Sequence, residues 1–422
     1  MTPTRRRLLQ GAAAIWGATT FGAVTSRSAR AARGPRKFLF LFASGGWDAT
    51  PLDPKFGADG VSAVQGTDMD PQTSLGQVGN LSWSSGPDRP AMDRYFSRWN
   101  KATALCRGVN VHSAGHEAGM RWMMTGTSAS SYADWPTTLA AFAGEDYPMP
   151  HVVFSGPAYA GTEGAALVRG GGGTLLELID GSIVGRVDEP APVAVSPVDT
   201  MADALVYERA AAFADQQSGL GRTRAEDLLA TLDRTMELEG RRFEAGLGDT
   251  GSGFLDQCVM ATEIMRLGLS RCAMVGIPGG WDTHGGNQNV GAQMDDFFTD
   301  LDALMTHLAS TPGRDAAWLI DEVVIVATSE LGRTPKFNGA MGRDHWPYTS
   351  MLLAGSGIQG DTVCGATDEG FIAYPVDLAT GQVRDGGTTL GTEHIGTALL
   401  TLGGLDSEKH LPGVEPLRGV LR

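Results

Sequence analysis

The chain has 422 residues, 42% hydrophobic and 19% charged, which suits one large domain or a large domain with an insertion. Its formal net charge is −15, which excludes nucleic-acid binding through a general positive field and argues against attachment to anionic lipid. The four cysteines lack Cys-x-x-Cys spacing, which excludes a zinc ribbon. One or two disulfides stay open, but the sequence alone assigns no pairing among Cys106, Cys258, Cys272 and Cys364.

The first 31 residues have the pattern of a twin-arginine export signal. Three arginines at positions 5–7 are followed by two leucines, then by an uncharged apolar run over 11–24 and a small-residue cleavage site at 28–31. A Sec signal is the closest alternative, and the run is too short for a membrane anchor. We expect the twin-arginine machinery to export a folded, periplasmic or secreted protein that carries no membrane anchor. Removing the leader's five arginines would lower the net charge to −20.

From residue 34 to 422 the sequence predicts one α/β domain. Short β-rich apolar runs occur at Phe38–Phe42, Ala104–Val111, His151–Phe154, Arg271–Ile277, Glu322–Thr328 and Ser350–Ala354. Helical periodicity falls between them, at Ala91–Asn100, Glu117–Met124, Arg224–Gly246, Gly253–Leu269, Gly291–Ala309 and Thr392–Leu402. Alternating strands and helices predict a mostly parallel sheet with helices on both faces. Residues 155–222 are rich in glycine and proline and are interpreted as an inserted cap, with a separate domain as the alternative.

Polar residues follow the ends of four of these strands. Since ligands of open α/β sheets bind at the carboxyl ends of strands, we expect these side chains to meet at one edge. They are Asp48 after the first strand, Ser113 and His116 after the second, Asp282 and His284 after the fourth, and Glu330 and Arg333 after the fifth, with Asp344 and His345 in a following loop.

Each of these clusters also has a structural interpretation. Asp48 suits a turn or helix cap, and Glu330 suits an ion pair with Arg333. Asp282 and His284 suit a hydrogen bond within a loop, and Asp344 with His345 suits a surface pair. Because so many coincide at one edge, we favour a site for a divalent ion. Carboxylates with imidazoles favour zinc or manganese, while calcium and magnesium stay open.

The motifs of the second half resemble a known family. The segments Gly-Gly-Trp-Asp-Thr-His at 279–284, Ser-Glu-Leu-Gly-Arg-Thr-Pro at 329–335 and Gly-Arg-Asp-His-Trp at 342–346 resemble the domain of unknown function 1501 family. That family is similar to the alkaline phosphatase and sulfatase superfamily. The resemblance covers nearly all of the chain after the leader, from Gly-Gly-Trp-Asp at 45–48 to the last helix.

The resemblance implies a metal-binding hydrolase fold and a ligand set. By it, Asp48, Asp282, His284, Glu330 and His345 are expected metal ligands for one or two ions, and the polar cluster in the loop adds Asp344 to this set. Two departures affect this set: Glu330 stands where a histidine usually follows an aspartate, and Asp282 and His284 are closer in sequence than usual. Gly115 also replaces the serine that often precedes the histidine matching His116.

The function expected from these residues is metal-assisted hydrolysis of a phosphate or sulfate ester. Ser113, near a helix start, would be the nucleophile, with an activated water as the alternative. Arg333 would hold the ester oxygens, and His116 would act as a general acid or a further ligand. The alternative function is a non-catalytic envelope protein that keeps the fold and binds a metal or a glycan.

Overall fold

A computed structural model describes residues 35–55, 74–143, 147–170, 197–239 and 253–422. Contacts divide the chain into Met1–Ala31 and Ala32–Arg422. The export signal predicted at residues 1–31 lies outside the described residues, and the predicted domain boundary stays a prediction. In the described residues, no helix is both long enough and apolar enough to cross a membrane.

An eight-stranded sheet forms the centre of the larger unit, in the order β12-β4-β11-β8-β1-β7-β5-β6. The strands are β1 (Lys37–Ala43), β4 (Thr103–Asn110), β5 (His151–Val153), β6 (Leu167–Arg169), β7 (Cys272–Gly276), β8 (Val323–Ser329), β11 (Tyr348–Gly355) and β12 (Thr362–Cys364). β11 runs antiparallel to both β4 and β8, and every other neighbouring pair is parallel. The predicted mostly parallel α/β fold is therefore confirmed.

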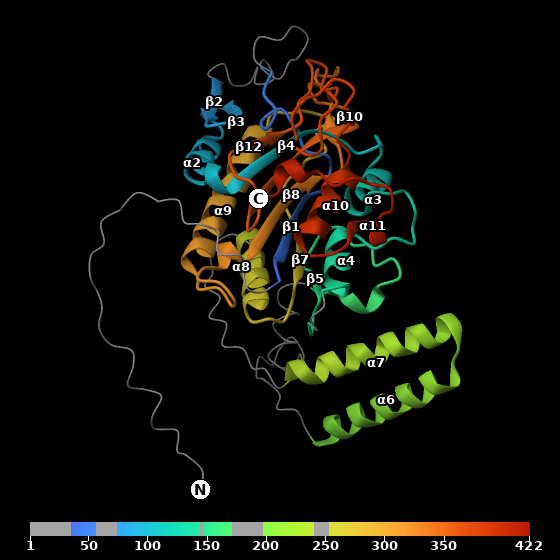
Figure 1. Cartoon of the computed structure of the whole chain (residues 1–422). Coiled ribbons are helices and arrows are strands. Elements are labelled where there is room, and N and C mark those ends of the chain that lie inside the picture. The colour runs from blue at the N-terminus through green and yellow to red at the C-terminus, as the bar shows by residue number, and fades with distance from the viewer. Residues whose placement is uncertain (1–34, 56–73, 144–146, 171–196, 240–252) are drawn as a thin grey trace, which may run out of the picture. The chain divides into compact units, whose positions relative to one another are not determined.

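Helices cover both faces of the sheet (Figure 1). Along β1, alternate side chains enter two separate cores, with Leu39 and Leu41 on one face and Phe38 and Phe40 on the other. The first core is covered by α2 (Pro90–Trp99), α8 (Gly253–Arg266) and α9 (Val290–Ser310). The second is covered by α3 (His116–Thr125), α4 (Trp135–Ala141) and α10 (Thr392–Leu402), with α11 (Ser407–His410) after it in the chain. A sheet buried on both faces explains why its strands read as continuous apolar runs.

Every predicted strand and helix has a counterpart, and the ends differ by a few residues. Two small hairpins escaped prediction, β2 (Ser74–Val78) with β3 (Leu81–Ser85) and β9 (Gly332–Arg333) with β10 (His345–Trp346). So did α4, which begins with Pro136 in its first turn and is capped by the side chain of Asp134. Its seven residues are too few for a clear helical period.

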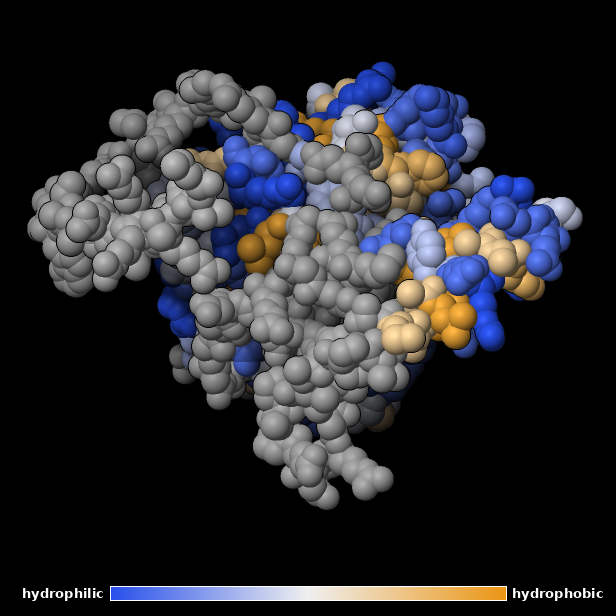
Figure 2. Space-filling view, turned by 90° about the horizontal axis from the view of Figure 1, so that it is seen from below, coloured by the Kyte–Doolittle hydropathy of each residue, from blue (hydrophilic) through white to orange (hydrophobic). Residues whose placement is uncertain are grey.

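The predicted cap region contains a helix that its weak periodicity concealed. α6 (Pro197–Gln216) lies entirely inside it and packs against α7 (Gly219–Glu239), which begins inside it. The predicted helix over 224–246 thus begins earlier, and its last residues, 240–246, lie outside the described residues. Figure 2 shows exposed hydrophobic residues beside hydrophilic ones, and exposed apolar side chains of this pair include Met201, Phe213 and Leu220. Because the apolar residues of α6 are not gathered on one face, residue spacing alone could not define it.

Candidate metal centre

Four side chains from three separate segments meet at the carboxyl edge of the sheet. His116 is the first residue of α3, Asp282 and His284 lie in the loop after β7, and His345 begins β10. His345 reaches this edge because β11, which follows it, runs antiparallel and therefore starts where its neighbours end. His116, Asp282 and His284 thus follow the ends of parallel strands as predicted, whereas His345 precedes a strand that runs the opposite way.

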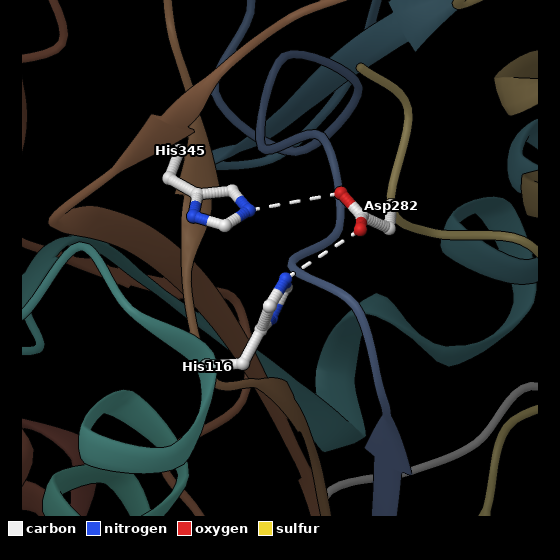
Figure 3. A group of neighbouring side chains, drawn as sticks. All are labelled: His116, Asp282 and His345. Carbon is white, nitrogen blue, oxygen red and sulfur yellow. Dashed lines mark ion pairs between the residues drawn. The ribbon is translucent and has the colours of Figure 1, made fainter. Parts of the chain in front are cut away.

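The carboxylate of Asp282 lies between the imidazoles. Its two oxygens are 3.6 Å from His116 Nε2 and 3.6 Å from His345 Nε2 (Figure 3). His116, Asp282 and His345 offer ligand atoms that all lie within 4.8 Å of one another. His284 Nε2 lies 3.4 Å from an Asp282 oxygen and 2.9 Å from His345 Nε2. Three imidazole nitrogens and one carboxylate therefore converge, which is the donor set of a zinc-type site.

The Nδ1 atom of each imidazole, which faces away from the cluster, contacts a hydrogen-bond acceptor. His116 Nδ1 lies 2.8 Å from Glu330 Oε1, and His284 Nδ1 lies 2.8 Å from Asp344 Oδ1. His345 Nδ1 lies 2.8 Å from the carbonyl oxygen of Ala114, which can only accept. These partners favour the tautomer with hydrogen on Nδ1. Nε2 is then the nitrogen that each imidazole turns toward the cluster, and the Nε2 atoms of His284 and His345 lie within hydrogen-bond distance of each other.

Positive charge around Asp282 keeps it ionised. Burial opposes ionisation, but the hydrogen bond from Arg333 and the positive charges nearby prevail and lower the pKa of Asp282. The pKa of His345 is also lowered, first by burial, although the Ala114 hydrogen bond opposes the shift. Hydrogen bonds from Asn338 and His284 lower the pKa of Asp344. A carboxylate and a neutral imidazole are the protonation states that metal ligands need.

Arg333 is fully buried and directs its guanidinium at backbone and Asp282. It donates to the carbonyls of Gly45, Gly46 and Arg343, and its Nη2 lies 2.7 Å from Asp282 Oδ1. This arrangement ties the loop after β1 to the loop after β7. The predicted role of Arg333 in holding ester oxygens stays a prediction, while its contacts here hold Asp282 in place.

Glu330 and Asp344, both predicted as ligands, lie behind the imidazoles. The Glu330 carboxylate also accepts from the backbone N–H of Gly45 and from the Ser329 hydroxyl, and it is buried. α3 approaches this strand end closely because Gly119 has no side chain: a Cβ there would lie 2.7 Å from the Glu330 carbonyl. The structure thus gives both acids a contact with the outer side of a histidine.

Asp48, the first predicted ligand, lies apart from the cluster. Its carboxylate is buried and contacts Arg343 Nε at 3.1 Å, Asn287 Nδ2 at 3.1 Å and the N–H of Thr50 at 2.9 Å. Arg343 is also buried, so the two opposite charges balance each other inside the protein. Ser113 likewise bonds locally, because its hydroxyl donates to the carbonyl of Gly115 and accepts from the Gly115 N–H.

Two contributors to the cluster were not predicted. The carbonyl of Ala114 orients His345. Because every residue has a backbone carbonyl, the sequence does not indicate which one makes this contact. Asn338 donates to the carbonyl of His284 and to Asp344 Oδ1, both at 3.0 Å. Asn338 lies between the family-like motifs at 329–335 and 342–346, and the resemblance gave it no role.

The family model described as "Protein of unknown function (DUF1501)" matches residues 36–385. The chain therefore belongs to this family, and the family resemblance in its sequence motifs is confirmed. No curated protein matches the sequence.

Several solved structures are similar to the chain at low sequence identity. Ps i-CgsB has a TM-score of 0.40 and 8% identity, over 91% of this chain and 75% of that one. A protein in the alkaline phosphatase superfamily from Vibrio parahaemolyticus has a TM-score of 0.36 and 9% identity, over 90% and 70%. The PsFucS1 sulfatase from Pseudoalteromonas sp. has a TM-score of 0.36 and 11% identity, over 92% and 72%. The fold class itself rests on the strand order and directions described above.

Proposed function

We propose that this member of the DUF1501 family binds one divalent transition-metal ion, zinc or manganese, and hydrolyses a phosphate or sulfate ester. The observation that carries the proposal is the convergence of three imidazole Nε2 atoms on the Asp282 carboxylate. The proposed ligands are His116, Asp282 and His345, with His284 completing the set.

The fit to a cation follows from the hydrogen bonds. With hydrogen on each Nδ1, the Nε2 atoms of His284 and His345 present lone pairs to each other at 2.9 Å. Two such lone pairs repel each other unless a cation, either a shared proton or a metal ion, lies between or beside them. A nitrogen-rich set favours zinc or manganese over calcium and magnesium, which prefer oxygen ligands.

The surrounding residues keep these ligands in position. Glu330 and Asp344 fix the orientation and tautomer of His116 and His284, as carboxylates behind metal-binding histidines do. Arg333 anchors Asp282 and neutralises part of its charge. We therefore assign Glu330, Asp344 and Arg333 positioning roles rather than contact with the ion.

The start of α3 supplies a place for an anionic ester. Gly115, its N-cap residue, has no side chain that could satisfy the N–H groups of the first turn. These groups and the helix dipole favour a negative group beside His116. A bound divalent ion would supply Lewis-acid stabilisation of the ester oxygens and would make a water more acidic. We propose that this chain's residues orient the ester, with Ser113 as the candidate nucleophile and water as its alternative.

Elemental analysis and hydrolysis assays test this proposal together. We expect about one zinc or manganese per folded chain, together with turnover of an aryl phosphate or aryl sulfate. Asp282→Asn should lose both, while Asp385→Asn, an identical change at an exposed site outside the cluster, should keep both. Absence of metal after reconstitution with zinc and manganese would refute the site. Ser113→Ala separates the two nucleophiles, because turnover survives only if water attacks.

A second candidate is a metal- or glycan-binding envelope protein without catalysis. It is favoured by the local hydrogen bonds of Ser113, which engage the Gly115 backbone rather than the cluster. Stoichiometric metal with no turnover across aryl phosphates and sulfates would support this function and contradict the hydrolase.

We also propose export by the twin-arginine route, with the export machinery as the transient partner. Replacing Arg5, Arg6 and Arg7 by lysine should leave the protein in the cytoplasm. Fractionation of cells that produce both forms tests this, and unchanged export of the variant would contradict it.

A further inference from the structure

Two cysteines lie opposite each other on neighbouring strands. Cys106 of β4 and Cys364 of β12 are register partners in a parallel pair. Partners in register point to the same face of a sheet, and both side chains belong to the same buried core. Cys364 is also the neighbour that contributes most to raising the pKa of the Cys106 thiol. Neighbouring strands place such Cα atoms about 4.8 Å apart, inside the range that a disulfide spans.

We propose that Cys106 and Cys364 form a disulfide when the chain folds under oxidising conditions. Each thiol loses its hydrogen as the sulfur–sulfur bond forms. The two electrons and two protons pass to a disulfide oxidant such as glutathione disulfide, which is reduced to two thiols. The reaction proceeds through a mixed disulfide between the oxidant and one of the two cysteines.

The other two cysteines have no such partner. Cys272 lies on β7, four strands from β4, which corresponds to about 19 Å across the sheet. Cys258 belongs to the core on the opposite face. The expected product is therefore one disulfide and two free thiols.

Burial determines when the bond can form. Both thiols are fully buried, and the hydrogen bond with Cys364 together with burial raises the pKa of the Cys106 thiol. Because thiolates are the attacking species, the closed pair reacts slowly. β12 is a three-residue strand at the edge of the sheet, paired with β4 on one side. We therefore expect the disulfide to form before β12 pairs with β4 during folding, or when β12 transiently separates from β4.

The crosslink would enclose the candidate metal centre. His116, Asp282 and His345 all lie between positions 106 and 364, and β4 leads into the segment that carries His116. A closed loop of this length restricts the unfolded chain, so the oxidised protein should melt at a higher temperature than the reduced one.

Thiol counting on the full chain tests the proposal. The protein is refolded in a glutathione redox buffer, alkylated under denaturing conditions and weighed intact. We expect two alkylated cysteines and, after digestion without reductant, a peptide that joins Cys106 to Cys364. Four alkylated cysteines, or a crosslink to Cys258 or Cys272, would overturn it.

Two variants provide matched controls. Cys258→Ala should keep the crosslink and leave one alkylated cysteine, whereas Cys364→Ala should leave three. Reductant should lower the melting temperature of the wild type and of Cys258→Ala but not that of Cys364→Ala. An equal drop in all three would contradict the proposed pairing.

Discussion

The loops that follow β1 and β7 have the same local sequence and different outcomes. Residues 45–48 and 279–282 both read Gly-Gly-Trp-Asp, and their strands are parallel neighbours. Trp47 and Trp281 are both buried and pack edge to face, with ring centroids 6.4 Å apart. Yet the side chain of Asp48 is 1% exposed and that of Asp282 is 51% exposed.

The difference arises in the backbone and in the partners. Gly46 has a φ of +78°, a conformation open to glycine, while Gly280 lies outside that region. Asp48 meets the buried guanidinium of Arg343, whereas Asp282 meets Arg333 and three imidazoles. The same tetrapeptide therefore places one aspartate in a buried ion pair with Arg343. It leaves the other aspartate half exposed, beside Arg333 and three imidazoles.

The largest effect is expected for Asp48→Ala. This change leaves Arg343 buried without its carboxylate, so the free energy of unfolding should fall by about 3–5 kcal/mol. Metal content per folded chain should stay the same. Urea denaturation with elemental analysis checks both, and a loss below about 1 kcal/mol would contradict the scaffold role.

Asp282→Asn should change the stability gained from metal binding and leave the metal-free stability nearly unchanged, the reverse of Asp48→Ala. In the wild type, zinc at 100 times its dissociation constant should add about 2.7 kcal/mol to the free energy of unfolding. The variant should lose that gain, while its metal-free stability should change by less than about 1 kcal/mol because Asp282 is half exposed. Denaturation with chelator and with zinc measures the two quantities. If zinc raised the free energy of unfolding of the variant as much as that of the wild type, Asp282 would not be a ligand.

A smaller loss of zinc affinity is expected when an acid that contacts a histidine Nδ1, such as Asp344, is replaced. Asp344→Asn keeps an oxygen for His284 Nδ1 but removes the charge, so zinc affinity should fall about 10-fold. Competition with a chromogenic chelator gives the affinity, with Asp385→Asn as the control. A loss as large as that of Asp282→Asn would instead make Asp344 a direct ligand.

The smallest expected effect is a loss of folding stability at acid pH. The folded-state pKa of Asp282 is lowered below its ordinary 3.8, so its contribution to stability is present above that value and is lost as pH falls below it. With chelator present, the wild type should lose more stability than Asp282→Asn between pH 5 and pH 2, by less than about 1 kcal/mol. Melting curves across this range check the sign, and parallel curves would contradict it.

Much of the fold could be predicted because the local spacing of apolar residues indicates where its strands and helices lie. Apolar runs such as Phe38–Phe42 reflect burial on both faces of the sheet, and the helical periods reflect packing of one face. The short helix α4 and the weakly periodic α6 lack those patterns, so they were missed.

The sequence by itself determined that acids and imidazoles follow the strand ends and therefore gather at one edge. Only the tertiary structure decided which groups each of them contacts. Asp48 pairs with Arg343, and Glu330 and Asp344 stand behind His116 and His284. His345 reaches the edge through an antiparallel strand. The physical reason is that charge compensation and hydrogen-bond direction depend on groups distant in the chain, such as Arg343 and the carbonyl of Ala114, which local spacing does not specify.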